Sequence, residues 1–166
     1  MANIDTPIWL LDVDGVLNVD RPPWHEPPHQ GYAYYNGKEY KIRWSPSLAQ
    51  RVRTIIAAKT ATVMWSTTWC IAAEQIERLL HFPQLHRVFG TVKVTNEDKL
   101  WIADTLAKSG CRVIWTDDTA IPDAGDAYDR LSSNNRVLMI RPDDRRGLTP
   151  DDMDRIEAFI GAGDGS

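Results

Sequence analysis

Two aspartates, Asp12 and Asp14, follow the apolar run of residues 8–11 and are separated by a single valine. Because alternate residues of a strand point to the same side, both carboxylates can converge where a buried strand ends, and Gly15 lets the chain turn there. Like charges this close need a cation, and a hard metal such as Mg²⁺ binds carboxylate oxygen and bridges to phosphate. One carboxylate can then attack phosphorus while the other transfers a proton. The motif therefore indicates Mg²⁺-dependent phosphoryl transfer.

Two other interpretations of the motif compete with this one. A strand followed by an Asp-Gly turn requires no function, and the spacing DxDG also occurs in calcium loops. Val16 and Leu17 follow Gly15 and supply no further oxygen ligands, which argues against a calcium loop.

Three further polar groups occur downstream in an order that suits this chemistry. A second apolar run ends in the hydroxyl residues 66–68, whose hydroxyl and backbone N–H groups can hold phosphate oxygens. Lys99 lies in the first turns of an expected helix, and its ammonium can offset the charge of carboxylates and phosphate. A third apolar run ends in the acidic pair at 117–118, one of which can complete a metal site. Taken singly, these are a helix cap, a solvated lysine and a turn, so the prediction depends on their occurring together.

Four features in this order resemble the haloacid dehalogenase (HAD) superfamily of phosphatases and phosphotransferases over nearly the whole chain: DVDGVLN, Thr67, Lys99 and the Asp117-Asp118 pair. The resemblance implies that Asp12 is the nucleophile and forms an aspartyl-phosphate. Asp14 would be the general acid–base, with its backbone carbonyl on Mg²⁺. Thr67 and Lys99 would hold the phosphoryl group.

The resemblance also implies that the last acidic pair gives one direct metal ligand and one supporting partner. We expect Asp118 to be the ligand and Asp117 the partner, although the sequence does not settle this choice. The segment WSTTW and the later Arg-Pro-Asp and Gly147-Leu148-Thr149 segments resemble, more narrowly, a HAD subgroup associated with RNA-repair proteins.

The pattern of apolar residues predicts strands that alternate with helices, which is typical of an α/β fold with a three-layer, Rossmann-like parallel sheet, the HAD fold. We expect residues 1–166 to form one HAD-like domain. The expected strands are 8–13, 61–66, 112–116 and 136–141; the expected helices are 46–58, 70–81, 97–109, 123–133 and 150–161, with a short link through Val88 and Phe89 before the third helix.

Residues 18–45 are expected to form a small β-hairpin insertion instead of a large cap domain, with Asn36-Gly37 in its tight turn. In one interpretation its aromatic residues only anchor the hairpin to the domain. In the other it is a substrate flap on which a tyrosine or tryptophan stacks a base. The candidate substrate-binding residues are Arg21, Lys41, Arg43 and Thr68. For a separable flap, replacing Tyr32–Arg43 by a short turn should spare hydrolysis of a small aryl phosphate.

The composition bounds the partners and the location. With 166 residues and 43% hydrophobic residues, the chain is long enough for a proper core. A net charge of −4 argues against broad duplex DNA binding, but a phosphorylated small molecule or a nucleic-acid end needs fewer cations. The sequence has no membrane-length apolar run and no signal-like start, so we expect a cytoplasmic protein with reduced Cys70 and Cys111. The four histidines lack the spacing of zinc ligands.

The sequence therefore predicts an enzyme, a Mg²⁺-dependent phosphomonoester hydrolase of the HAD type. Nucleic-acid ends and nucleotides are its candidate substrates. A phosphotransferase or phosphomutase would use the same residues with a different acceptor. A non-catalytic phospho-ligand binding module is the alternative class, but such a module needs no nucleophile such as Asp12.

Overall fold

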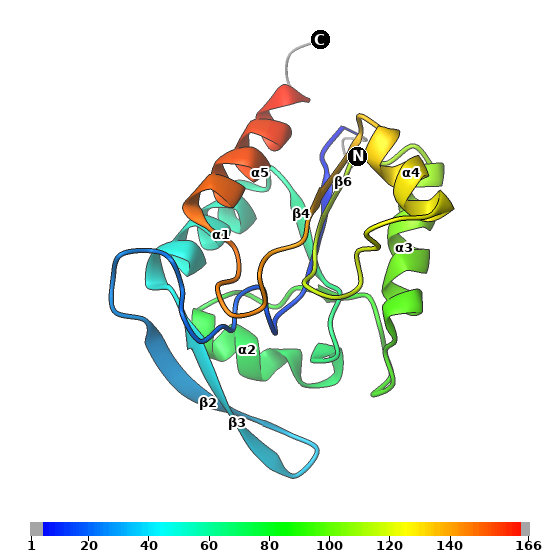
Figure 1. Ribbon diagram of the computed structural model, residues 1–166. Helices are drawn as coiled ribbons and strands as arrows, with labels where there is room; N and C mark the ends of the chain where they lie inside the picture. The colour runs from blue at the N-terminus through cyan, green and yellow to red at the C-terminus, as the bar shows by residue number, and fades with distance from the viewer. Residues whose placement is uncertain (1–4, 164–166) are drawn as a thin grey trace.

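The computed structural model describes residues 5–163 (Figure 1). These residues are built around a sheet of five parallel strands in the order β5-β4-β1-β6-β7. The strands are β1 (Ile8–Leu11), β4 (Thr62–Trp65), β5 (His86–Arg87), β6 (Val113–Thr116) and β7 (Val137–Ile140). The chain runs from β1 to β4 and β5 on one side and then returns to β6 on the other side. Open α/β sheets bind ligands at such a reversal, beyond the carboxyl ends of the strands.

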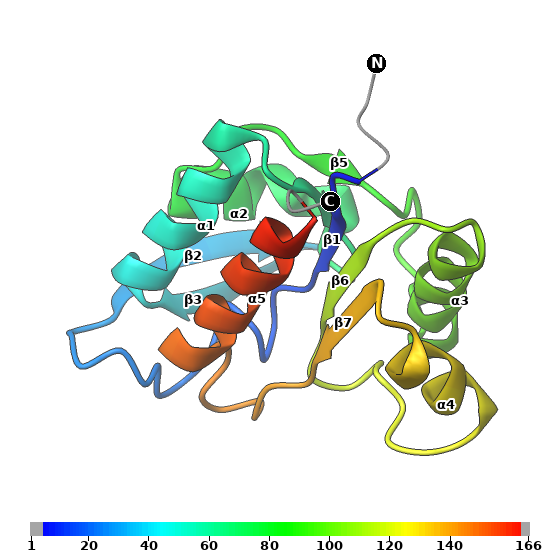
Figure 2. The same ribbon diagram turned by 90° about the horizontal axis from the view of Figure 1, so that it is seen from above.

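Helices cover both faces of this sheet, as Figure 2 shows: α1 (Pro46–Ala58) and α5 (Pro150–Ala162) lie on one side, and α3 (Asn96–Lys108) and α4 (Asp126–Ser133) lie on the other. Strand β1 is buried on both faces. Its Trp9 and Leu11 enter the core that contains α1 and α5 residues, whereas Leu10 enters the core that contains α3 and α4 residues. The predicted three-layer parallel α/β fold is therefore confirmed.

The start of α3 matters for the site because it determines where Lys99 points. Thr95 caps this helix in a reciprocal capping box with Asp98, so the first turn begins at Asn96. Lys99 then lies one turn into the helix and is buried at the carboxyl ends of β1 and β6.

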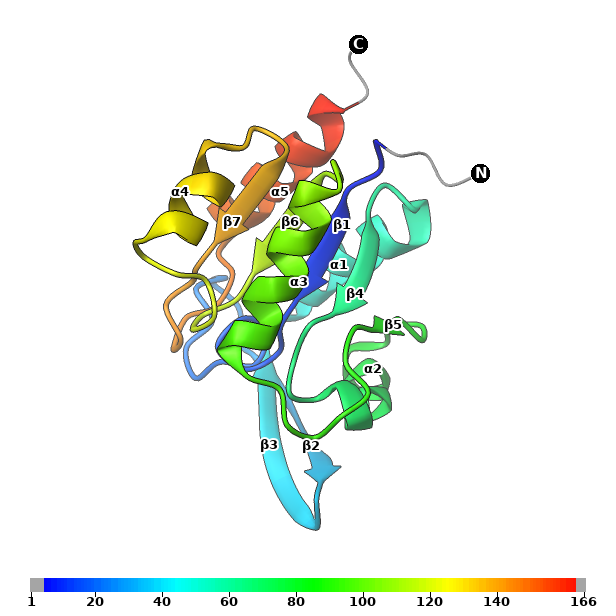
Figure 3. The ribbon, with the colours of Figure 1, turned by 90° about the vertical axis from the view of Figure 1, so that its right-hand side faces the viewer.

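The hairpin consists of β2 (His29–Tyr35) and β3 (Lys38–Trp44), and it projects beyond the carboxyl ends of the parallel strands (Figure 3). Asn36 and Gly37 form its two-residue turn with φ of 51° and 75°, as this pair favours. Opposite residues of the two strands lie on the same face, so the hairpin has an inner and an outer face.

The two faces bear separately on the two interpretations of the hairpin, as an anchor to the domain and as a substrate flap. On the inner face, Ala33, Ile42 and Trp44 are buried in the main core and anchor the hairpin. On the outer face, Tyr32 is exposed opposite Lys41. Anchoring is therefore shown for the inner face, whereas Tyr32 and Lys41 of the outer face are exposed.

Several expected elements differ from the structure. The helix expected at 70–81 begins as a 3-10 turn, Cys70–Ala72, and continues as α2 (Ala73–Leu80). The helix expected at 123–133 begins only at Asp126, because Gly125 has a φ of 101°, which no helix accommodates. The link before α3 contains the short strand β5, whose two residues are too few for a periodic signal. Within the described residues, no helix is both long enough and apolar enough to cross a membrane.

Candidate active site

Asp12 follows β1 directly and lies at the carboxyl edge of the sheet, where it is 5% exposed. Its Oδ1 accepts a hydrogen bond of 2.8 Å from the Val13 N–H. Its Oδ2 accepts one of 3.0 Å from the Lys99 ammonium. Thr67, in the loop after β4, lies close enough for its hydroxyl to lower the pKa of this carboxyl group. One buried carboxylate is thus held by the backbone after β1 and by Lys99 of α3.

Lys99 bridges two acidic residues that come from different strands. Its Nζ lies 3.0 Å from Asp12 Oδ2 and 2.8 Å from Asp117 Oδ2, and all three side chains are buried. Burial alone would lower the pKa of the Lys99 ammonium, but the charges of Asp12 and Asp117 outweigh it, and the pKa is raised. The two carboxylates therefore favour the charged form of the Lys99 side chain.

The acidic pair after β6 divides into two different environments. Asp117 is fully buried, and its Oδ1 accepts backbone hydrogen bonds of 2.9 Å from Thr119 and 2.7 Å from Ala120. Asp118 is half-buried and packs against Gly15 so closely that a Cβ there would lie 2.1 Å from its Oδ2. Gly15 also has a φ of 74°. The glycine of the DxDG motif is therefore needed both for the turn and for the approach of Asp118.

Oxygen atoms of Asp12, Asp117 and Asp118 all lie within 4.8 Å of one another. Burial, followed by the charge of Asp117, raises the pKa of Asp12 to about 8 and raises the pKa of Asp118 above its usual value. Three carboxylates and one ammonium leave an excess of negative charge that a divalent cation would neutralise. The donor set is all oxygen and partly buried, so it fits Mg²⁺.

Asp14 is exposed, unlike Asp12, and both of its carboxylate oxygens accept hydrogen bonds from side chains. Asn18 Nδ2 donates to Oδ1 at 2.9 Å, and Trp69 Nε1 donates to Oδ2 at 3.0 Å. Sequence reasoning did not select Asn18 or Trp69, although both lie inside the motifs DVDGVLN and WSTTW. No spacing rule indicates that they meet at Asp14.

The hydroxyl residues after β4 occupy different positions. Thr67 is fully buried beside Asp12, and its Oγ1 also accepts a hydrogen bond of 3.2 Å from the Trp69 N–H. Neither helical segment that follows has a side-chain cap, so the interpretation of Thr67 as a helix cap is wrong; its hydroxyl instead accepts from the N–H two residues further on, as in a local turn. Thr68 is exposed, and the buried Ser66 hydroxyl has no partner among the described residues.

The basic candidates lie around the site rather than in it. The Arg43 N–H donates to Asn18 Oδ1 at 2.8 Å, and its guanidinium donates to the Asp20 carbonyl at 3.0 Å. Lys41 lies two residues back along β3 on the exposed outer face. Arg21 is exposed, and its backbone N–H donates to the Arg145 carbonyl at 2.9 Å.

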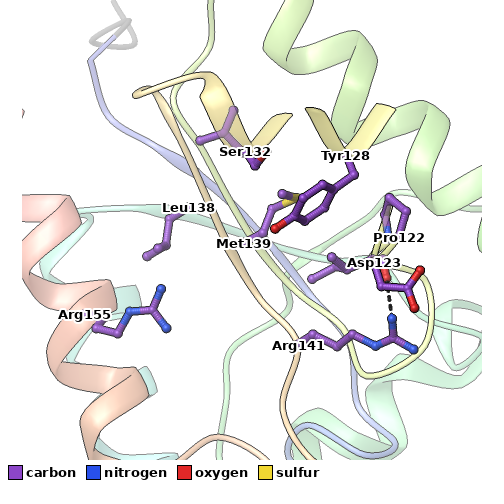
Figure 4. Close-up of a pocket in the computed structure, with 10 residues that line it drawn as sticks. Pro122, Asp123, Tyr128, Ser132, Leu138, Met139, Arg141 and Arg155 are labelled. Carbon is purple, nitrogen blue, oxygen red and sulfur yellow. Dashed lines mark hydrogen bonds between the residues drawn. The ribbon is translucent and has the colours of Figure 1, made fainter. Parts of the chain in front are cut away.

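A hollow of about 430 Å³ lies between α4, β7 and α5, and Figure 4 shows the residues that line it, which do not include the three carboxylates. Arg141 connects it to the site, because its Nε donates to the Asp118 carbonyl at 3.0 Å and its Nη1 to the Ile121 carbonyl at 3.0 Å. This arginine therefore fixes the loop that carries Asp117 and Asp118.

The family described as "HAD domain in Swiss Army Knife RNA repair proteins" matches residues 8–153, which include every acidic residue of the carboxylate group. No curated protein matches the chain.

Proposed function

The chain belongs to the family of HAD domains in Swiss Army Knife RNA repair proteins, and on that basis we propose that it is a Mg²⁺-dependent phosphomonoester hydrolase. Membership of this family supports a HAD-type phosphatase activity. The finer proposal is that Asp12 is the nucleophile, that an aspartyl-phosphate forms on it, and that a phosphorylated nucleic-acid end is the substrate.

The observation that carries the proposal is the bridge from Lys99 to Asp12 and Asp117, at 3.0 and 2.8 Å, beside the third carboxylate of Asp118. A purely structural ion pair would need one carboxylate for one ammonium. Three converging carboxylates with one ammonium instead favour a site that also receives a divalent cation and a phosphate.

Residues Asp12, Asp118 and the backbone carbonyl of Asp14 would hold Mg²⁺, which when bound neutralises charge on the carboxylates and the phosphate. We assign Asp118 as the direct ligand because Lys99 and two backbone N–H groups already engage the Asp117 carboxylate. Asp117 would instead orient Lys99.

The proposed reaction has two steps. In the first, an Asp12 oxygen forms a bond to phosphorus, the bond from phosphorus to the leaving oxygen breaks, and Asp14 gives that oxygen a proton. In the second, water attacks the phosphorus of the aspartyl-phosphate while Asp14 takes its proton, which releases phosphate and restores Asp12. Lys99 and the Thr67 hydroxyl would hold the phosphoryl oxygens and offset their charge.

The substrate proposal is supported by the family description and by the hairpin. On the outer face the exposed Tyr32 lies opposite Lys41, and one residue pair on either side are Tyr34 opposite Glu39 and Arg43 opposite Gln30. An exposed aromatic side chain beside a basic one suits a single nucleic-acid strand. Thr68 and Arg21 would add contacts at the exposed rim of the site. No large cap covers the carboxylates among the described residues, so a polymer end has access.

We also propose that residues 1–166 form one domain, with 18–45 as its insertion, and that the protein works in the cytoplasm. The free thiols of Cys70 and Cys111 suit a reducing compartment.

The experiment that tests the function is a phosphatase assay with Mg²⁺ on 4-nitrophenyl phosphate, nucleotides and 3′- or 5′-phosphorylated oligonucleotides. Asp12→Asn should abolish turnover and remain folded, because the amide is nearly isosteric. Chelation should abolish turnover reversibly. Lys41→Ala should lower kcat/KM only for oligonucleotides, with a salt-dependent effect. Full activity of Asp12→Asn, or in excess chelator, would reject the mechanism, and binding of phosphate without any turnover would favour a binding module.

A further inference from the structure

The Asp14 carboxylate is exposed, yet it is held on both sides. A proton-transferring group must lie within hydrogen-bond distance of the leaving oxygen, and an unrestrained carboxylate would sample several rotamers. Here Trp69 Nε1 donates to one oxygen at 3.0 Å and Asn18 Nδ2 donates to the other at 2.9 Å. Two donors from different parts of the chain therefore fix the orientation of this carboxylate.

Trp69 is itself buried against the hairpin. Its side chain is 4% exposed, and its ring meets Tyr35 at 5.4 Å with an interplanar angle of 57° and Tyr40 at 5.5 Å with an angle of 81°. An indole N–H can only donate, and the one hydrogen bond that the Trp69 side chain makes within residues 5–163 is to Asp14. The indole N–H of Trp9, by contrast, donates to the Thr116 hydroxyl inside the core.

Asn18 is the second residue that connects the hairpin to Asp14. Its Oδ1 accepts the Arg43 N–H of β3 at 2.8 Å, which leaves Nδ2 directed toward Asp14. The orientation of the amide is thus determined by a backbone donor of the hairpin. Both groups that hold Asp14 are fixed by β2 or β3.

We propose that Trp69 and Asn18 are positioning residues that hold Asp14 for proton transfer, and that the hairpin keeps both of them in place. The inference rests on the proposed function, in which Asp14 is the general acid–base. The hairpin then serves the chemical step itself, in addition to any contact that its outer face makes with a substrate.

The test is Trp69→Phe, which keeps the aromatic packing but removes the N–H. Ethyl phosphate has a poor leaving group that needs the proton, whereas 4-nitrophenyl phosphate has a good leaving group that needs it little. The quantity to measure is kcat/KM, because it reports only the steps up to departure of the leaving group. Trp69→Phe should lower kcat/KM for ethyl phosphate on the order of 10-fold to 100-fold, because the proton donor Asp14 is no longer held in place. For 4-nitrophenyl phosphate the loss should be much smaller.

Two further variants separate positioning from structure. In an Asp14→Asn background, Trp69→Phe should cause no additional loss, because the group that it positions is gone. Tyr40→Leu should reproduce the leaving-group dependence, because Tyr40 holds the Trp69 ring. The matched control is Trp24→Phe, which also loses one indole hydrogen bond, of 2.8 Å to the Leu148 carbonyl, and should lower the two kcat/KM values little and equally.

Equal losses on both substrates, or a full further loss in the Asp14→Asn background, would overturn the positioning role while leaving the proposed function intact. A uniform loss with Tyr40→Leu would overturn the part played by the hairpin. A wild-type protein that is folded, binds Mg²⁺ and hydrolyses neither these two substrates nor nucleotides nor 3′- or 5′-phosphorylated oligonucleotides would reject the proposed function and the inference with it.

Discussion

Lys99→Met is the substitution for which the structure predicts the largest combined effect on stability and activity. It replaces the ammonium by an uncharged side chain of similar length and leaves Asp12 and Asp117 buried without the group that now lies 3.0 and 2.8 Å away. Removing one partner of a buried ion pair costs about 3–5 kcal/mol of unfolding free energy. Losing a preorganised positive charge beside the phosphoryl group should lower kcat on the order of 10²-fold to 10³-fold.

The matched control lies on the same helix. Lys108 pairs with Asp104 at 3.0 Å, but its side chain is 64% exposed, so Lys108→Met should cost less than about 1 kcal/mol and leave kcat unchanged. Urea unfolding and the 4-nitrophenyl phosphate assay with saturating Mg²⁺ measure both quantities. The stability difference between Lys99→Met and the wild type should shrink at acid pH, because protons replace the missing ammonium on the carboxylates. If the two variants behaved alike in both assays, the Lys99 bridge would have neither role.

Two further predictions concern the metal site. In chelated protein the free energy of unfolding should fall as the pH rises from about 4 to about 8. Burial and the charge of Asp117 raise the pKa of Asp12 to about 8 and also raise the pKa of Asp118. Because carboxyl groups of the unfolded chain ionise near pH 4, the folded state loses stability as the pH rises through this range. Mg²⁺ should restore stability most at pH 8, and a flat thermal-unfolding profile would contradict this. Gly15→Ala should weaken Mg²⁺ binding roughly 10-fold by displacing Asp118. The control is Gly37→Ala: Gly37 also has a positive φ, but no atom lies within 4 Å of a Cβ built there, so this substitution should affect only stability. Titration calorimetry with Mg²⁺ distinguishes the two variants.

The structure changes one expectation about the hairpin. As a separable flap, it could be replaced by a short turn without loss of activity on small aryl phosphates. Instead, Ala33 and Ile42 are buried in the main core, and Tyr35 and Tyr40 hold the tryptophan that contacts Asp14. Deleting the strands would remove core contacts and the support of Asp14 together, so point substitutions on the outer face are the better test of substrate binding.

The amino-acid sequence by itself was sufficient for the features that depend on neighbouring residues. The apolar run before Asp12 predicts the strand that carries this residue to the edge of the sheet, and the Asn36-Gly37 pair predicts a tight hairpin turn. Alternation along the strand did not place Asp14, because β1 already ends at Leu11, and Asp14 is exposed outside the group of Asp12, Asp117 and Asp118. Alternation of strands and helices predicts the three-layer sheet. These features follow from backbone geometry and local side-chain preferences, which the sequence encodes over a few residues.

Only the tertiary structure decided how distant residues meet. Lys99 reaches Asp12 across 87 positions, and Trp69 reaches Asp14 across 55. The different environments of Asp117 and Asp118 arise because Lys99 approaches one and Gly15 the other. Such contacts depend on the order and register of strands and on the packing of α3 and the hairpin against them. No local spacing rule contains that information, because many strand orders are compatible with the same local pattern.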